Sequence, residues 1–204
     1  MSNLALRLLA CIVVPLALLP QPSTAQDKPV RVRGTIERLE GSVYVVKARD
    51  GTELKVTLAD NAPVSAVVKA SLADVKPGSY VGIASLPQAD GAQKALELLL
   101  FPEAMRGVAE GHYAWDLQPS SMMTNGNVEQ TVTAKDGQVL TVKYKDGEKQ
   151  IAVPPEAPIV TFVPGDRAEL KPGAAIFIAA ARPQPDGTLQ APRIAVGRGI
   201  VPPM

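Results

Sequence analysis

Short apolar runs separated by glycine- and proline-containing turns recur along the chain and predict β-strands. Residues 54–58 and 140–144 alternate apolar and polar side chains, the period of a strand with one buried face. Residues 80–84 and 175–179 are more continuously apolar, and we expect them to cross the middle of a sheet. Asp-Gly pairs between such runs supply the positive-φ positions of tight hairpins. The pattern predicts an all-β protein.

The same landmarks occur twice in the same order. Gly34 and Gly126 each precede a Val/Ile-rich strand and lie 92 residues apart, whereas the other landmarks repeat after 95 or 96 residues. These other landmarks are Asp-Gly at 50–51 and 146–147, Ala-Pro at 62–63 and 157–158, Lys-Pro-Gly at 76–78 and 171–173, and Asp-Gly at 90–91 and 186–187. A near-constant offset over so many positions predicts the duplication of one β-rich unit.

The duplication leads to a prediction of fold class and domain boundaries. A unit of about 70 residues with five or six short strands must close on itself or pack against its twin, because an open sheet of that size exposes an apolar face and free edges. Ser71 and Asp74 are placed to cap one helical turn before a strand. We therefore expect two tandem small OB-like β-barrels joined by an irregular connector, after an N-terminal signal peptide. The predicted segments are the signal peptide (1–25), the first barrel (26–101), the connector (102–124), the second barrel (125–197) and a disordered tail (198–204).

The first 25 residues have the three parts of an export signal. Arg7 is followed by an apolar run over residues 8–19, and Ser23 and Ala25 occupy the small-residue positions that a signal peptidase reads. Cleavage after Ala25 would remove the only cysteine, Cys11. The expected location is periplasmic or secreted, with no membrane insertion once the signal is cleaved.

Composition argues against a nucleic-acid partner. The chain has 21 basic and 20 acidic residues, and removal of the leader takes away Arg7 and leaves 20 of each. A balanced chain has no electrostatic reason to approach nucleic acid. The aromatic residues make up only 4% of the chain, and Tyr44, Tyr80 and Tyr144 are scattered, so no stacking platform is predicted.

The order of these turn motifs resembles a known family. Gly before a Val/Ile strand, Asp-Gly, Leu-x-x-Val/Leu-Lys-Pro-Gly, an apolar strand and a second Asp-Gly are similar to the small bacterial exported OB-like domains of unknown function (DUF5666). The likeness covers residues 32–101 and 125–196. Because these are turn motifs, the resemblance implies a fold and carries no catalytic residues.

The connector differs from both repeats and is the candidate functional segment. It holds the only histidine, the only tryptophan and three of the five methionines. Loops of this length in compact proteins are commonly functional. We expect it to form a ligand- or partner-binding surface from Arg106, Glu110, His112, Tyr113, Trp115 and Asp116. An alternative is a structural clamp, in which aromatic side chains and methionines fill the groove between the barrels and Arg106 pairs with Glu110 or Asp116.

Two chemical alternatives remain open. A metal site could use His112 with Asp116 or Glu110 and thioether sulfur from Met122 or Met123, a donor set suited to copper or zinc. A hydrolase could use His112, Asp116 and Ser120 or Ser121, but no nucleophile motif accompanies them.

The leading expectation is a non-catalytic accessory protein that binds a small ligand or an unknown envelope partner. A periplasmic metal-handling protein is the alternative, and no cofactor is predicted.

Overall fold

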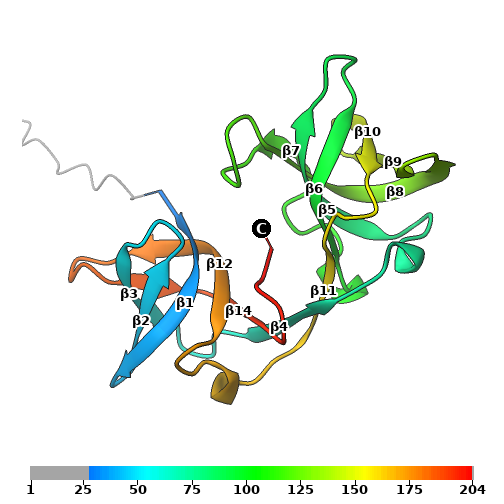
Figure 1. Ribbon diagram of the computed structural model, residues 1–204. Helices are drawn as coiled ribbons and strands as arrows, with labels where there is room; N and C mark the ends of the chain where they lie inside the picture. The colour runs from blue at the N-terminus through cyan, green and yellow to red at the C-terminus, as the bar shows by residue number, and fades with distance from the viewer. Residues whose placement is uncertain (1–27, 204) are drawn as a thin grey trace, which may run out of the picture.

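The computed structural model describes residues 28–203, so the predicted signal peptide at 1–25 lies outside the described residues. The predicted all-β class is confirmed: among the described residues, fourteen strands are accompanied only by short 3-10 turns (Figure 1). Within residues 28–203 no helix is long and apolar enough to cross a bilayer. The strands form one hydrogen-bonded path that closes on itself in two places.

The first closure makes a five-stranded barrel from two distant parts of the chain. Its strand order is β1-β2-β3-β13-β12, and β12 pairs back onto β1. The strands are β1 (Val30–Glu40), β2 (Val43–Ala48), β3 (Glu53–Leu58), β12 (Ala175–Pro183) and β13 (Leu189–Ala191). We call this barrel one. The most buried side chains of its core are aliphatic and include Ile36, Val56 and Ile178.

The second closure makes barrel two with the same plan. Its order is β8-β9-β10-β6-β5, and β5 pairs back onto β8. The strands are β5 (Tyr80–Pro87), β6 (Gln93–Leu100), β8 (Met122–Ala134), β9 (Gly137–Tyr144) and β10 (Gly147–Val153). The buried core is again aliphatic, with Ile83, Leu98 and Leu140 at its centre.

Two extended strands join the barrels. β4 (Val64–Lys69) and β11 (Ile159–Pro164) pair antiparallel between them, as the lower centre of Figure 1 shows. Each of these two strands also pairs in parallel with a further strand. β4 pairs with β14 (Ile194–Gly197), which is itself paired with β12 of barrel one, and β11 pairs with β6 of barrel two. Val67, Leu99 and Val160 are buried here in a third apolar cluster with Phe177 and Ala195.

The register of every one of these pairings repeats between the two halves. Gly34 lies opposite Ile176 in barrel one, and its equivalent Gly126 lies opposite Val81 in barrel two. Glycine is required at both positions because a neighbouring strand lies very close. A Cβ at Gly34 would lie 2.3 Å from the carbonyl oxygen of Lys47, and a Cβ at Gly126 would lie 2.3 Å from that of Lys143. Equivalent contacts at equivalent positions support the duplication read from the sequence.

The pairing partners differ from those expected of two contiguous barrels. Each barrel takes three strands from one repeat and two from the other. The extended β4 and β11 carry the chain across instead of letting it turn back. Pro63 and Pro158 bias the preceding residues, Ala62 and Ala157, toward extended backbone, and β4 and β11 then satisfy each other's hydrogen bonds.

The predicted cap at Ser71 is confirmed. Ser71 accepts a hydrogen bond from the Ala73 N–H, and Asp74 accepts one from the Ser71 N–H, at the start of η1 (Leu72–Asp74). Asp166 and Glu169 repeat this box at η3 (Arg167–Glu169). A Lys-Pro-Gly turn follows each of these boxes and contacts the other repeat. The Gly78 N–H donates to the Val128 carbonyl, and the Gly173 N–H donates to the Ile36 carbonyl.

The end of the chain also differs from the expected disordered tail. The Arg198 N–H donates to the Val67 carbonyl, and Arg49 donates to the carbonyl of Pro202, which is buried with Pro203. Ile200 packs against the third apolar cluster. The tail returns to the region between the barrels, where Figure 1 places the C-terminus.

Cutting the connector tests the crossed pairing. We expect a variant with a protease site inserted in the exposed segment 107–110 to stay a single particle after cleavage, because each barrel needs strands from both fragments. Size-exclusion chromatography and native mass spectrometry would show one species with both fragments, and circular dichroism would match the uncut protein. Separation into two folded fragments would contradict the crossed arrangement.

Candidate functional site

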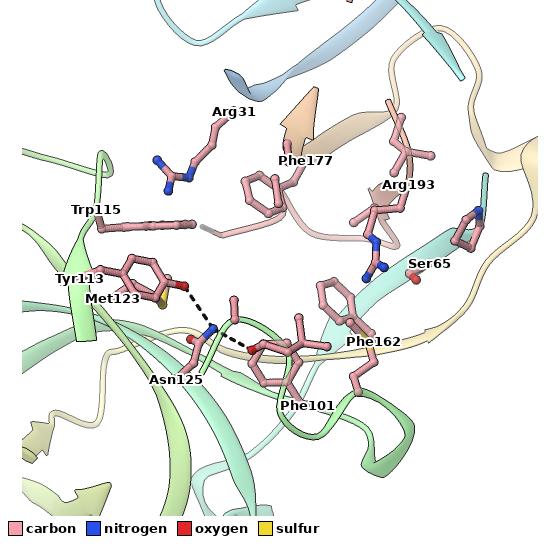
Figure 2. A pocket seen from close by; sticks show the side chains of 18 residues that line it. Arg31, Ser65, Phe101, Tyr113, Trp115, Met123, Asn125, Phe162, Phe177 and Arg193 are labelled. Atoms are coloured by element: carbon pink, nitrogen blue, oxygen red, sulfur yellow. Dashed lines mark hydrogen bonds between the residues drawn. The ribbon is translucent and has the colours of Figure 1, made fainter. Parts of the chain in front are cut away.

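A cavity of about 480 Å³ lies between the two barrels. Barrel one contributes residues of β1 and β12, and β14 adds the segment around Ile194. The opposite wall comes from the connector, from β7 (Gly111–Ala114) and from β8, while β4 and β11 contribute Ser65 and Phe162. We call this the inter-barrel pocket (Figure 2).

Aromatic side chains are concentrated in this pocket. All three phenylalanines of the chain, Phe101, Phe162 and Phe177, line it together with its single tryptophan, Trp115, and with Tyr113. The buried side chains of the two barrel cores, by contrast, are all aliphatic. The aromatic residues therefore mark the pocket and not the barrel interiors.

Trp115 forms one wall of the pocket, and its indole ring contacts Arg31 and Tyr113. The Arg31 guanidinium lies 3.8 Å from the ring centroid, and Tyr113 meets the indole edge-on with centroids 6.2 Å apart. Figure 2 shows Arg31 on one side of the indole and Tyr113 on the other. The indole Nε1 is buried and has no hydrogen-bond partner within the described part of the chain. Stacking, including the cation–π contact, therefore fixes the ring.

Asp116 connects the connector to barrel one. Its carboxylate accepts from Arg33 at 2.8 Å and lies 3.3 Å from Arg31. Burial raises the pKa of Asp116, but the hydrogen bond and charge of Arg33, with the charge of Arg31, outweigh burial and leave the pKa below its ordinary value. Asp116 is thus a carboxylate at neutral pH. Its half-exposed position keeps the contribution of the ion pair to stability small.

The floor of the pocket is a small polar network. The buried Asn125 donates through Nδ2 to the Val108 carbonyl at 3.2 Å and to the Tyr113 hydroxyl at 3.3 Å (dashed in Figure 2). Tyr80 donates to the same carbonyl. Burial, with the nearby charge of Glu110, raises the pKa of Tyr80 to about 12, so its hydroxyl stays a donor. The network ties the connector loop to barrel two.

The two repeats differ at the pocket. Phe177 corresponds to Gly82 and Phe162 to Val67, so the second repeat supplies rings where the first has small or aliphatic residues. A Cβ at Gly82 would come within 2.9 Å of the Phe101 ring and 2.7 Å of Asn125 Oδ1. Glycine at 82 therefore leaves room for the Phe101 ring, which makes the pocket asymmetric.

The predicted binding residues fall into separate groups. Tyr113 and Trp115 line the pocket, and Asp116 lies beside it through its pairing with Arg31. Glu110 is exposed, outside the lining. Arg106 is outside it too: the expected pairing with Glu110 or Asp116 is wrong, because Arg106 binds Glu103 of η2 (Glu103–Met105) at 2.6 Å. Arg106 also donates to Asn127 Oδ1 and to the Gly78 carbonyl.

His112 lies on the other face of its strand. The cross-strand row Leu98–Ile83–Thr124–His112 continues the core side of barrel two, whereas the next row, with Met123 and Tyr113, faces the pocket. His112 Nδ1 is 2.9 Å from Thr124 Oγ1, and its ring stacks on Tyr144. His112 therefore belongs to the packing of barrel two.

The structure does not gather the suggested metal ligands. His112 and Met123 point to opposite faces of the sheet, Met122 shares the face of His112, and Asp116 is bound by arginines. Residues 28–203 contain no group of three or more His, Cys, Asp or Glu side chains able to hold a metal ion.

The suggested hydrolase residues are likewise occupied separately. Ser121 is buried, and its hydroxyl lies within hydrogen-bond distance of the Trp115 and Gln118 carbonyls. Ser120 is exposed in a turn with φ of 64°. His112 bonds to Thr124, and no contact joins it to either serine among the described residues.

Sequence reasoning missed much of the pocket. Arg31, Phe162, Phe177 and Arg193 lie within the repeats and outside the connector, yet all four line the cavity. One signal was available: in an aliphatic chain, Phe162 and Phe177 stand where the first repeat has Val67 and Gly82.

The placement of His112 predicts its titration. Burial, with the charge of Lys149, lowers the pKa of His112 below its ordinary value of 6.5. The unfolded chain then binds the proton more tightly than the folded protein does. The contribution of neutral His112 to the free energy of unfolding should therefore be fully present above about pH 6.5, and it should decrease as the pH falls from there through the lower pKa of the folded state.

This titration can be read directly, because His112 is the only histidine. Proton NMR should give a midpoint below 6.5 in the folded protein and near 6.5 in urea. The variant His112→Gln should lose this part of the pH dependence of Tm. A folded midpoint at or above 6.5 would contradict the packed position.

No protein-family model, curated protein or solved structure matches this chain. The resemblance to exported OB-like domains therefore stays a prediction from turn motifs. The geometry of the inter-barrel pocket is the basis for a functional assignment.

Proposed function

We propose that this chain is a non-catalytic binding protein of the bacterial periplasm that holds an apolar small molecule between its two barrels. The observation that carries this proposal is the gathering of Phe101, Phe162, Phe177, Tyr113 and Trp115 around one open cavity. Binding pockets are concave, mostly apolar and have a few placed polar groups. Here those groups are the Asn125–Tyr113 network and two arginines, Arg31 and Arg193.

The size of the cavity supports ligand binding over core packing. Protein interiors contain few voids larger than a water molecule. A volume of about 480 Å³ lies within the range of roughly 300–1,000 Å³ typical of small-molecule sites. Rings that served only to join the barrels would be expected to fill this space themselves.

The rigidity of the walls supports the same proposal. Eleven of the eighteen lining residues lie in β-strands, and the Arg31–Asp116 contact and the Asn125 network hold the connector in place. A preformed site loses little conformational freedom on binding. An envelope protein that inserts an apolar side chain into the pocket would use the same walls.

The proposed fold family and location rest on separate observations. In each barrel the strand from the end of one repeat runs parallel to the third strand of the other, as β13 does beside β3. A closed five-stranded barrel with this order supports the OB-like assignment. The periplasmic location rests on the predicted export signal at 1–25.

Binding can be tested with N-phenyl-1-naphthylamine, a neutral apolar fluorophore. We expect it to brighten on binding and to quench Trp115 by energy transfer, because the single tryptophan lies in the pocket wall. Ala179→Phe, which places a ring at an exposed lining position, should weaken binding by about tenfold or more, a loss of about 1.4 kcal/mol.

The matched control is Ala134→Phe, at an exposed position of β8 outside the pocket lining. It should bind the probe like the unaltered protein. Unchanged Trp115 emission with the probe, or equal binding by both variants, would contradict the proposal.

A further inference from the structure

The charged residues that line the pocket are all of one sign. Among its lining residues, Arg31 and Arg193 are cationic and none is acidic. The remaining polar lining side chains, Ser65, Tyr113 and Asn125, are neutral. An apolar cavity whose charged lining residues are all positive favours a ligand that carries negative charge.

Arg31 is already engaged. Its guanidinium stacks on Trp115 at 3.8 Å and lies 3.3 Å from Asp116. It forms part of the wall and retains little capacity for another anion.

Arg193 is not engaged. It is exposed just before β14, and no hydrogen bond, ion pair or ring contact to it is present among residues 28–203. In Figure 2 its side chain points toward Phe162, on the pocket side. The equivalent position in the first repeat is Glu97, so the fold itself does not require a positive charge at this place. A guanidinium with five free donors beside an apolar cavity is suited to a carboxylate.

We propose that the inter-barrel pocket binds an amphipathic organic anion, with its apolar, ring-bearing body between the aromatic walls and its carboxylate on Arg193. This inference rests on the proposed binding function and adds the class of ligand. A single free guanidinium matches a monoanion, since one fork of donors pairs with one carboxylate. The aromatic walls offer stacking to a planar body.

The test compares three probes with one apolar body: 2-naphthoate, 2-naphthalenemethanol and 2-naphthylmethylammonium. Binding is followed by Trp115 emission and by isothermal titration calorimetry. We expect the order naphthoate, alcohol, ammonium, with naphthoate about tenfold tighter than the alcohol, and a decrease of this preference with added salt. Equal affinities for all three probes would overturn the inference.

Variants at position 193 then assign the anion contact. Arg193→Gln should lower the affinity for naphthoate about tenfold and leave that for the alcohol unchanged, and Arg193→Lys should restore part of it. Arg182→Gln, at an exposed arginine of β12 outside the pocket lining, is the matched control and should change neither. A naphthoate preference that survives Arg193→Gln would overturn the role of Arg193.

The outcomes separate the two proposals. Loss of the charge preference with retained binding of the neutral fluorophore would reject the anionic ligand and keep the binding function. Failure of every probe, charged or neutral, would reject both.

Discussion

The antiparallel pairing of β4 with β11 is the constraint on which the rest of the structure depends. Its register is centred on Val67 opposite Phe162, which are equivalent positions of the two repeats. Because each strand leads away from the barrel in which its repeat began, the pairing sends the second part of each repeat into the other barrel. Two units of one chain are thereby interlocked, and neither barrel is complete without both repeats.

The interlocking also creates the pocket. β4 and β11 lie paired between the barrels, and the space between the barrels is bounded by β12 and β14 on one side and by the β7–β8 hairpin on the other. The strand pairing of the two repeats is nearly symmetric, but the side chains that the two repeats present to the pocket differ. Phe162 and Phe177 from the second repeat and Phe101 at the end of the first give the space its aromatic lining. The aromatic lining thus depends on differences between the two repeats at equivalent positions.

The connector contributes to this site differently from what its composition indicated. Its histidine and one methionine turn to the core side of barrel two, whereas Tyr113, Trp115 and Met123 turn to the pocket, because neighbouring residues of a strand face opposite sides. Asp116 is directed to Arg31 and Arg33 of barrel one. A segment that is chemically unusual as a whole is therefore divided by strand geometry between the core side of barrel two and the wall of the pocket.

The sequence by itself determined the all-β class, the duplication, the turns and the Ser71 cap, because these depend on periodicity and on residues close together in the chain. It also pointed to Tyr113 and Trp115 as candidate binding residues, and the structure places both in the pocket lining. Only the tertiary structure decided which repeat supplies which strands to each barrel, since the backbone hydrogen bonds of a strand can be satisfied by its own repeat or by the equivalent strand of the other repeat. For the same reason the sequence could not show that one cavity is lined by Arg31, Phe162, Phe177 and Arg193. These residues share a surface only because each barrel contains strands from both repeats.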